Sequence, residues 1–324
     1  MEQIIMRENS QIHKNPKKKT MKRGKWFCII LMTIIIAQWL VFYLYSRINS
    51  VLTSFQYFDG ATETFKFYSF SDLFTNYKTF FNELRSNPFT GRYIWNGYLF
   101  FFVTTIISEF SVFIAFYLYK KCPASGIMLV CLMLPSTLAS MANPLMFKYF
   151  IEKAFPVLTD KFGLAGNYSL LFSREETALA ICLIMTAFLG FPGSMLFYVG
   201  QFGRTPKELV EAAQLDGITF IKEFWYIAFP SIFSMWSLGH LTILTGGLTA
   251  LGPGYALYAE KGYKYGMVTL QYDILIRVLG GDGKNPNYFY PYSAAINMVF
   301  AIITIAGLCL MKKIFDKVDP QAEY

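Results

Sequence analysis

Apolar residues occur in long runs along this chain, separated by shorter polar stretches. A helix needs about 20 predominantly apolar residues to cross the hydrocarbon core of a bilayer, so runs of this length are typical of membrane spans. Runs long enough to cross are found at 26–46, 95–119, 125–149, 177–202, 224–251 and 291–311. The pattern therefore predicts an all-α integral membrane protein with about six transmembrane helices.

The first run resembles a signal peptide at first sight, because basic residues precede it. Its apolar core is long enough for a complete span, and no small-residue cleavage pattern follows before Arg47. We therefore expect this run to remain in the protein as the first span.

Composition and charge agree with a membrane protein. Hydrophobic residues make up 54% of the chain and charged residues only 15%, which excludes an ordinary soluble domain. The net charge of +8 does not indicate nucleic-acid binding, because basic residues gather just before the first span, where they set orientation. These residues are Lys14, Lys17, Lys18, Lys19, Lys22, Arg23 and Lys25.

The remaining basic clusters predict the topology. With six spans, the clusters at 120–121, 204–207 and 312–317 fall on the same side as the basic amino-terminal residues. Short cytoplasmic loops carry an excess of Lys and Arg, so we expect both termini in the cytoplasm. The segments 47–94, 150–176 and 252–290 then lie outside.

The chain divides into four parts on this basis. Residues 1–25 form a basic cytoplasmic tail that contacts anionic membrane lipid, and residues 26–94 form the first transmembrane helix and an external segment. Residues 95–315 form the main transmembrane domain, and residues 316–324 form a cytoplasmic tail.

Few residues suit metal binding or catalysis. The five cysteines lie far apart without Cys-x-x-Cys spacing, and His13 and His240 are the only histidines. The sequence also has no Gly-x-x-x-x-Gly-Lys-Ser/Thr phosphate loop. We therefore predict no metal site, no catalytic residue and no ATP site within this chain.

A polar stretch between the fourth and fifth spans, residues 204–223, has well-defined local signals. Thr205 is expected to cap a helix, with Pro206 at its first position and Glu208 completing a capping box. Gly217 is expected to end this helix in the left-handed conformation. A second short helix, at about 219–226, then leads through Pro230 into the fifth span.

The same stretch carries a motif of many fixed positions. Glu211-Ala212-Ala213-Gln214-Leu215-Asp216-Gly217, followed by Ile227 and Phe229-Pro230, closely resembles the cytoplasmic EAA loop of binding-protein-dependent ABC importer permeases. The preceding residues 205–209 resemble the lead-in found in the sugar-importer branch. Phe229 and Ile218 replace the usual Leu and Ala but stay apolar. The resemblance covers roughly 95–315.

This resemblance implies a function and a set of partners. The loop would be a coupling helix that docks into a separate ATPase, so the chain would be a transport subunit rather than an enzyme. The expected partners are a second permease subunit, two cytoplasmic ATPase subunits that bind ATP and Mg, an extracellular solute-binding protein and membrane lipid, with no nucleic acid. The expected location is the bacterial cytoplasmic membrane. The coupling residues implied are Glu211, Ala212, Ala213, Asp216, Gly217, Ile227 and Pro230.

Carbohydrate is the expected cargo, chiefly because the loop resembles that of sugar importers. Aromatic residues, 19% of the chain, can stack on sugar rings, although aromatic residues also fill membrane cores. Candidate path residues are polar at membrane depth: Asn143, His240, Thr242 and Thr245. Hydrogen bonding between helices is the alternative role for each of them. For Glu109, the only acid deep inside a span, we expect a structural pairing.

Two alternative functions remain at this stage. The chain is consistent with an ABC permease for another polar solute. An ion-coupled secondary transporter would instead predict more spans, inverted repeats and several intramembrane acids, and the sequence has none of these.

Overall fold

The computed structural model describes residues 16–137, 142–163, 174–247, 251–280, 283 and 285–319, so most of the basic tail predicted at 1–25 lies outside the described residues. The first half contains α2 (Pro16–Gln38), η1 (Trp39–Leu44), α3 (Tyr45–Thr53), β1 (Gln56–Asp59), β2 (Thr64–Phe67), α4 (Thr75–Ser86), α5 (Pro88–Tyr119), α6 (Ser125–Met133), η2 (Leu134–Thr137), α7 (Ala142–Tyr149), η3 (Phe150–Ala154) and α8 (Phe155–Lys161). The second half contains α9 (Glu175–Phe202), α10 (Lys207–Leu215), α11 (Phe220–Glu223), η5 (Phe224–Ala228), α12 (Phe229–Gly247), α13 (Gly254–Tyr258), η6 (Ala259–Tyr265), α14 (Leu270–Val278), η7 (Pro286–Tyr288) and α15 (Tyr290–Val318).

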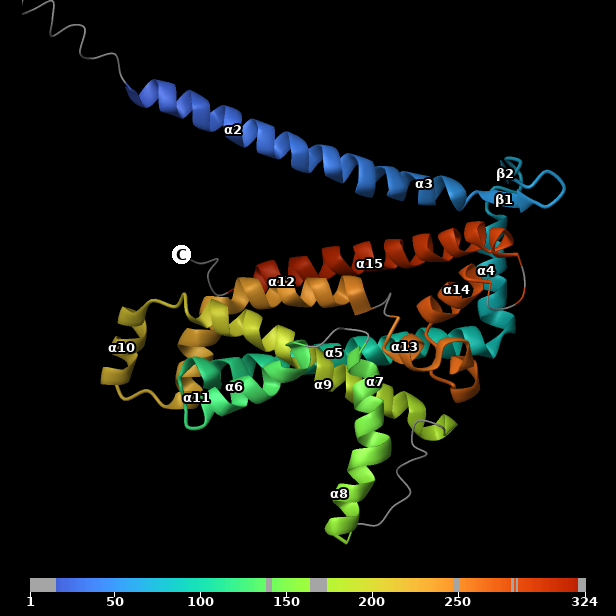
Figure 1. Cartoon of the computed structure of the whole chain (residues 1–324). Coiled ribbons are helices and arrows are strands. Elements are labelled where there is room, and N and C mark those ends of the chain that lie inside the picture. The colour runs from blue at the N-terminus through green and yellow to red at the C-terminus, as the bar shows by residue number, and fades with distance from the viewer. Residues whose placement is uncertain are drawn as a thin grey trace, which may run out of the picture.

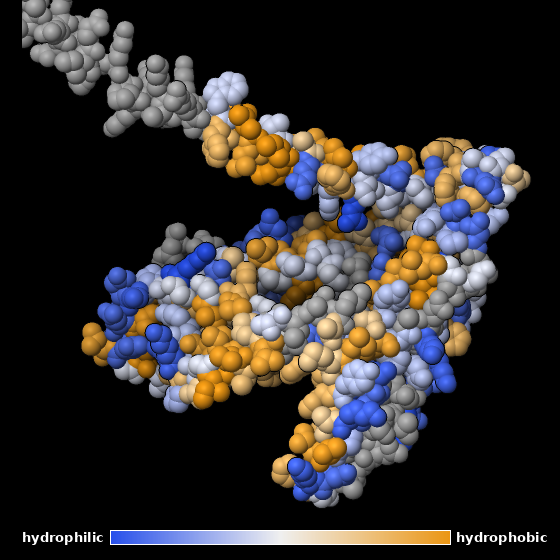
Figure 2. Space-filling model, in the orientation of Figure 1, coloured by the Kyte–Doolittle hydropathy of each residue, from blue (hydrophilic) through white to orange (hydrophobic). Residues whose placement is uncertain are grey.

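The predicted fold class, an all-α membrane protein, is confirmed. Within the described residues, five continuous helices are long and apolar enough to span a membrane. They cover Lys25–Thr53, Pro88–Tyr119, Glu175–Phe202, Phe220–Gly247 and Pro286–Val318. In Figure 2 apolar surface runs along the helices, and hydrophilic surface gathers around α10 at one end of the bundle.

The span predicted at 125–149 is not one continuous helix, which corrects the sequence-based expectation. The helix α6 ends at Met133, a 3₁₀ turn follows, and α7 begins at Ala142, with residues 138–141 outside the described part. Pro135 lies in this break. Proline lacks a backbone N–H, and its ring clashes with the preceding helical turn, so an α-helix does not continue through it without a kink or a break.

The chain nevertheless crosses the bundle between α5 and α9. These two helices run parallel, because Arg92 pairs with Glu175 at their starting ends and the Phe116 and Phe202 rings meet at their finishing ends. After leaving the finishing end of α5, the chain must return to the starting end of α9. Residues 120–174 therefore make one crossing, although no helix among their described residues is both long and apolar enough to be a span.

The other helices alternate in direction. Phe224 of η5, which leads directly into α12, meets Phe116 near the end of α5, and Phe233 of α12 meets Phe315 near the end of α15. Consequently α12 is antiparallel to both α5 and α15. Figure 1 shows the first residues of α2, the whole of α10 and the last residues of α15 at the same end of the molecule. We call this the α10 end, and the opposite end the hairpin end.

The segment expected to be external forms a small cap at the hairpin end. β1 and β2 form an antiparallel hairpin in which Gln56 faces Phe67 and Asp59 faces Thr64. The Lys66 ammonium is the main cause that lowers the pKa of Asp59 to about 2. This hairpin was not predicted, because its strands are only four residues long.

A polar network fastens α4 to the rest of the hairpin end. Glu83 of α4 accepts a hydrogen bond from Tyr292 of α15, and its other carboxylate oxygen lies 3.5 Å from an Arg277 guanidinium nitrogen. Arg277 also contacts Asp273 at 3.1 Å, and Tyr263 donates to Asp273 at 2.8 Å. Burial raises the pKa of Tyr263, and the Asp273 carboxylate adds to this effect, so the hydroxyl keeps its proton and acts as the donor.

We predict that Arg277→Met lowers the free energy of unfolding by about 2 kcal/mol, because it leaves two carboxylates without their cation, one of them buried. The check is the thermal unfolding midpoint of the purified protein in detergent. Arg85→Met removes an exposed cation from the same region and should leave the midpoint nearly unchanged. Equal midpoints for the two variants would contradict this account of the network.

Candidate functional site

The helix α10 stands at one end of the molecule, away from the bundle (Figure 1), and none of its residues is buried. Glu211 and Ala212 are exposed and Ala213 is half-buried. Apolar side chains also face solvent here, with Leu215 90% exposed. An exposed helix that presents small and apolar side chains is suited to docking against another surface.

The helix ends as the sequence predicts. Gly217 adopts a φ of +72°, in the left-handed region that glycine enters without a side-chain clash. Its N–H donates to Gln214 O at 3.1 Å, and the Ile218 N–H donates to Ala213 O at 3.1 Å. These two bonds form a Schellman motif, which satisfies the last carbonyls and turns the chain back toward the bundle. Asp216 and Gly217 thus both lie at the exposed turn.

The predicted capping box at the start of the helix is wrong. The helix begins at Lys207 and has no side-chain cap, while Thr205 is buried. The Thr205 hydroxyl instead forms a hydrogen bond of 2.8 Å with the Ser231 hydroxyl of α12. A tertiary contact therefore takes the hydroxyl that local sequence assigned to the helix terminus.

Ile227 and Pro230 do not lie on the exposed helix. They belong to η5 and α12, and both are half-buried. The returning segment also contains Glu223, which is buried and contacts Lys120 at the end of α5 through both carboxylate oxygens. Sequence reasoning missed this pair, because the two residues are separated by 103 positions and no local pattern links them.

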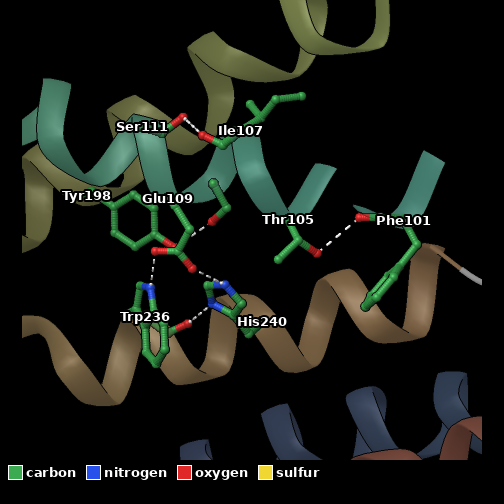
Figure 3. Close-up of polar contacts among 9 residues, drawn as sticks. Phe101, Thr105, Ile107, Glu109, Ser111, Tyr198, Trp236 and His240 are labelled. Atoms are coloured by element: carbon green, nitrogen blue, oxygen red, sulfur yellow. Dashed lines mark hydrogen bonds and ion pairs between the residues drawn. The ribbon is translucent and has the colours of Figure 1, made fainter. Parts of the chain in front are cut away.

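A second group of polar side chains lies deep between α5 and α12. Figure 3 shows Glu109 of α5 pointing toward Trp236 and His240 of α12. Trp236 Nε1 donates to Glu109 Oε2 at 3.1 Å, and His240 Nε2 lies 2.7 Å from Glu109 Oε1. His240 Nδ1 is 2.9 Å from the Trp236 carbonyl oxygen. The structural pairing expected for Glu109 is present, and it joins two spans.

A cavity of about 330 Å³ lies between α5, α9 and α12. Hydroxyl groups on its wall come from Ser108, Ser194, Tyr198 and Thr242. Ser108 and Tyr198 are hydrogen-bonded to each other at 3.0 Å. Hydroxyl groups on an otherwise apolar wall are suited to a small polar ligand.

The structure brings only some of the predicted path residues together. Thr242 faces the cavity, and His240 lies two positions earlier on α12. Thr245 is exposed and donates to the Thr242 carbonyl. Asn143 lies on a different helix, α7. Ser108 and Tyr198 were missed, because Ser and Tyr are common in membrane helices and only the fold places them opposite Thr242.

Comparison with known proteins gives relatives in both sequence and fold. No family model matches the chain. It is 27% identical over 257 residues to the maltose/maltodextrin transport system permease protein MalF of Vibrio cholerae, covering 72% of this chain and 46% of that protein. MalF of Salmonella typhimurium is 24% identical over 278 residues, covering 79% and 51%. The chain spans about half the length of the curated relatives it matches.

Two crystal structures of a bacterial ABC transporter for the acidic polysaccharide alginate contain a similar chain. The TM-scores are 0.66 and 0.70 at 15% identity, covering 93% of this chain and 98% of that chain. The second of these structures is a complex with an alginate pentasaccharide-bound periplasmic protein. This chain shares its fold with that chain of the alginate ABC transporter. The resemblance to sugar-importer permeases, stated from residues 205–230, is thereby confirmed in sequence and in fold.

Removing either member of the Glu109–His240 pair leaves the other at membrane depth with only its contact to Trp236. We predict that Glu109→Leu and His240→Leu each lower the free energy of unfolding by about 2 kcal/mol. The double variant should lose about 1 kcal/mol less than the sum of the two, because the residues share one contact. Thermal unfolding of the purified variants tests this, with Ser237→Ala on the same helix as the control. If the loss of unfolding free energy in the double variant equals the sum of the two single losses, the Glu109–His240 contact itself contributes nothing to stability.

Proposed function

We propose that this chain is the transmembrane permease subunit of a bacterial ATP-driven importer. The observation that carries the proposal is the exposed helix α10, which holds the Glu211-Ala212-Ala213 segment and the Gly217 turn away from the bundle. An isolated helix with this motif would serve to dock an ATPase. Similarity to MalF permeases in sequence, and to the alginate importer in fold, supports the same assignment.

The proposal gives the molecule an orientation in the bacterial cytoplasmic membrane. The α10 end faces the cytoplasm, since an ATPase that uses cellular ATP can dock only there. Both termini then lie in the cytoplasm, and the basic residues that precede the first apolar run meet the negatively charged inner leaflet. The hairpin end, with β1, β2 and α14, faces outward.

The proposed assembly contains a second permease subunit, two cytoplasmic ATPase subunits and an external solute-binding protein. ATP and Mg bind to the ATPase subunits, so this chain itself needs no cofactor and catalyses no reaction. α7 and α8 project from the side of the bundle (Figure 1), which supports contact with a second membrane subunit. The crystal structure of the alginate transporter with its periplasmic protein supports a docking partner outside the membrane.

The proposed cargo is a sugar or oligosaccharide delivered by the solute-binding protein. The relatives are named as transporters of maltose and maltodextrin or of alginate, all of which are carbohydrates. The hydroxyl groups on the mainly apolar wall of the cavity at Thr242 support this class, because hydroxyl groups can donate to and accept from sugar hydroxyls. Asn143, His240 and Thr245 remain proposed path residues but do not line this cavity.

The proposed docking of an ATPase on α10 can be tested at Glu211. With the second permease and the ATPase expressed beside the tagged chain, wild type should retain the ATPase during purification. Glu211→Arg should lose most of it, because an exposed acid that forms a charge-assisted hydrogen bond becomes a repulsive cation. The measurement is the amount of ATPase that co-purifies.

Glu63→Arg makes the same charge change at the hairpin end, where residue 63 is exposed, and should retain the ATPase. If well-folded wild type retains no ATPase, the importer assignment fails and an ion-coupled secondary transporter becomes the better explanation. If wild type and Glu211→Arg retain the ATPase equally, Glu211 is not part of the docking surface.

The proposed carbohydrate cargo can be tested by its effect on ATP hydrolysis. In the complex reconstituted with its solute-binding protein, maltotriose or an alginate oligosaccharide should stimulate ATP hydrolysis, whereas glutamine should not. Thr242→Val should raise the sugar concentration for half-maximal stimulation about fivefold, as expected when a hydrogen bond worth about 1 kcal/mol is lost. If glutamine stimulates hydrolysis and the sugars do not, the chain is better assigned as a permease for another polar solute.

A further inference from the structure

The helix α10 makes few contacts of its own with the bundle. Among its residues none is buried, and Leu209 and Leu215 are 51% and 90% exposed. If a docked partner moves α10, the movement is therefore transmitted to the bundle mainly through the segments at the two ends of the helix. The contacts at these ends decide which span receives that movement.

At the first end, the contact is short and leads to α12. Phe202 and Thr205 are buried, and the Thr205 hydroxyl bonds Ser231 at 2.8 Å. Ser231 in turn donates to the Ala228 carbonyl at 2.7 Å. Thr205 therefore joins this end, which continues directly from α9, to the beginning of the span that follows the loop.

At the second end, α11 and the η5 segment that follows it lie against α5 through aromatic rings. The Phe224 ring stacks on Phe113 at 4.7 Å, and the Phe220 ring lies 4.8 Å from Phe116. Stacked rings attract each other over a range of offsets, so they hold two helices together without defining one position along the axis. A directional contact is needed to set that position.

Lys120 and Glu223 supply the directional contact. The Lys120 ammonium lies 2.8 Å and 3.0 Å from the two Glu223 carboxylate oxygens. Their side chains are only 19% and 5% exposed, so water screens the pair little. A buried ion pair stabilises a fold little more than apolar side chains of the same size, but it can define one arrangement.

The location of Lys120 extends the connection into the membrane. Lys120 caps the end of α5, and Glu109 lies about three turns earlier, about 16 Å along the same helix. Glu109 contacts Trp236 and His240 of α12. A displacement of Glu223 is therefore carried by a hydrogen-bonded helix to a polar contact between two spans.

We propose that the Lys120–Glu223 ion pair is the link that transmits movement of α10 to α5, with both residues acting as positioning residues. This inference rests on the proposed function, because it supplies a mechanical role for the loop that docks the ATPase. The pair is separate from the exposed surface of α10, because both side chains are largely buried against the bundle.

The test separates transmission from stability by means of an apolar replacement. Lys120→Met with Glu223→Met keeps the volume and removes both charges, so the protein should fold normally. Lys222→Glu changes an exposed charge on the same short helix and is the matched control. Each variant is purified as the full complex with the second permease, the ATPase and the solute-binding protein.

Two measurements are made on each complex. The first is the amount of ATPase retained, which reports docking of α10. The second is the rate of tryptic cleavage after the exposed Lys261 and Lys264 at the hairpin end, with and without MgATP and vanadate. Nucleotide trapping should change this rate in wild type and in Lys222→Glu. The double Met variant should retain its ATPase but lose the change in cleavage rate.

Each alternative outcome overturns the inference in a distinguishable way. If the double Met variant responds to nucleotide as wild type does, the pair has only a structural role. If wild type retains the ATPase but shows no response, no movement reaches the hairpin end through this link. If wild type retains no ATPase, the proposed function fails, and the inference fails with it. A charge exchange, Lys120→Glu with Glu223→Lys, should restore the response that the double Met variant loses.

Discussion

The absence of water inside a bilayer is the constraint on which this structure depends. Each backbone N–H and C=O at membrane depth needs a partner within the protein, so the chain crosses the membrane mainly as long helices. The break between α6 and α7 is therefore informative. Backbone that departs from a helix at membrane depth has to be covered by protein or to line a cavity.

The same constraint explains why polar side chains occur in groups within the bundle. A carboxylate such as Glu109 is costly at membrane depth unless other residues satisfy it, and here Trp236 and His240 do so from the neighbouring span. Lys120 and Glu223 follow the same rule near the end of α5. Both pairs join elements that lie far apart in sequence, so each defines how two helices are placed relative to one another.

A shared fold at 15% identity shows which properties the architecture tolerates. Apolar side chains facing lipid can be exchanged for one another with little cost, because lipid and apolar side chains are equivalent environments. Positions with a geometric requirement are different. Gly217 must adopt a positive φ for the chain to turn back from α10, and the fold offers this position to glycine at the lowest energetic cost.

Local sequence determined the features that depend on neighbouring residues. The membrane-length apolar runs, the helix 207–215 and its termination at Gly217 all follow from hydrophobicity and backbone conformation, which act over a few residues. The resemblance of residues 211–230 to a known loop also needed only the sequence. These features were predictable because their physical causes lie within a single segment.

Only the tertiary structure decided the features that depend on distant partners. Thr205 was expected to cap α10, but its hydroxyl bonds Ser231, 26 residues away. Glu223 meets Lys120 across 103 residues, and Trp236 meets Glu109 across 127. Hydrophobic periodicity defines which face of a helix is buried but not which residue it meets. Packing of the helices selects the partner, because the energy of a polar contact depends on distance and direction in space rather than on separation along the chain.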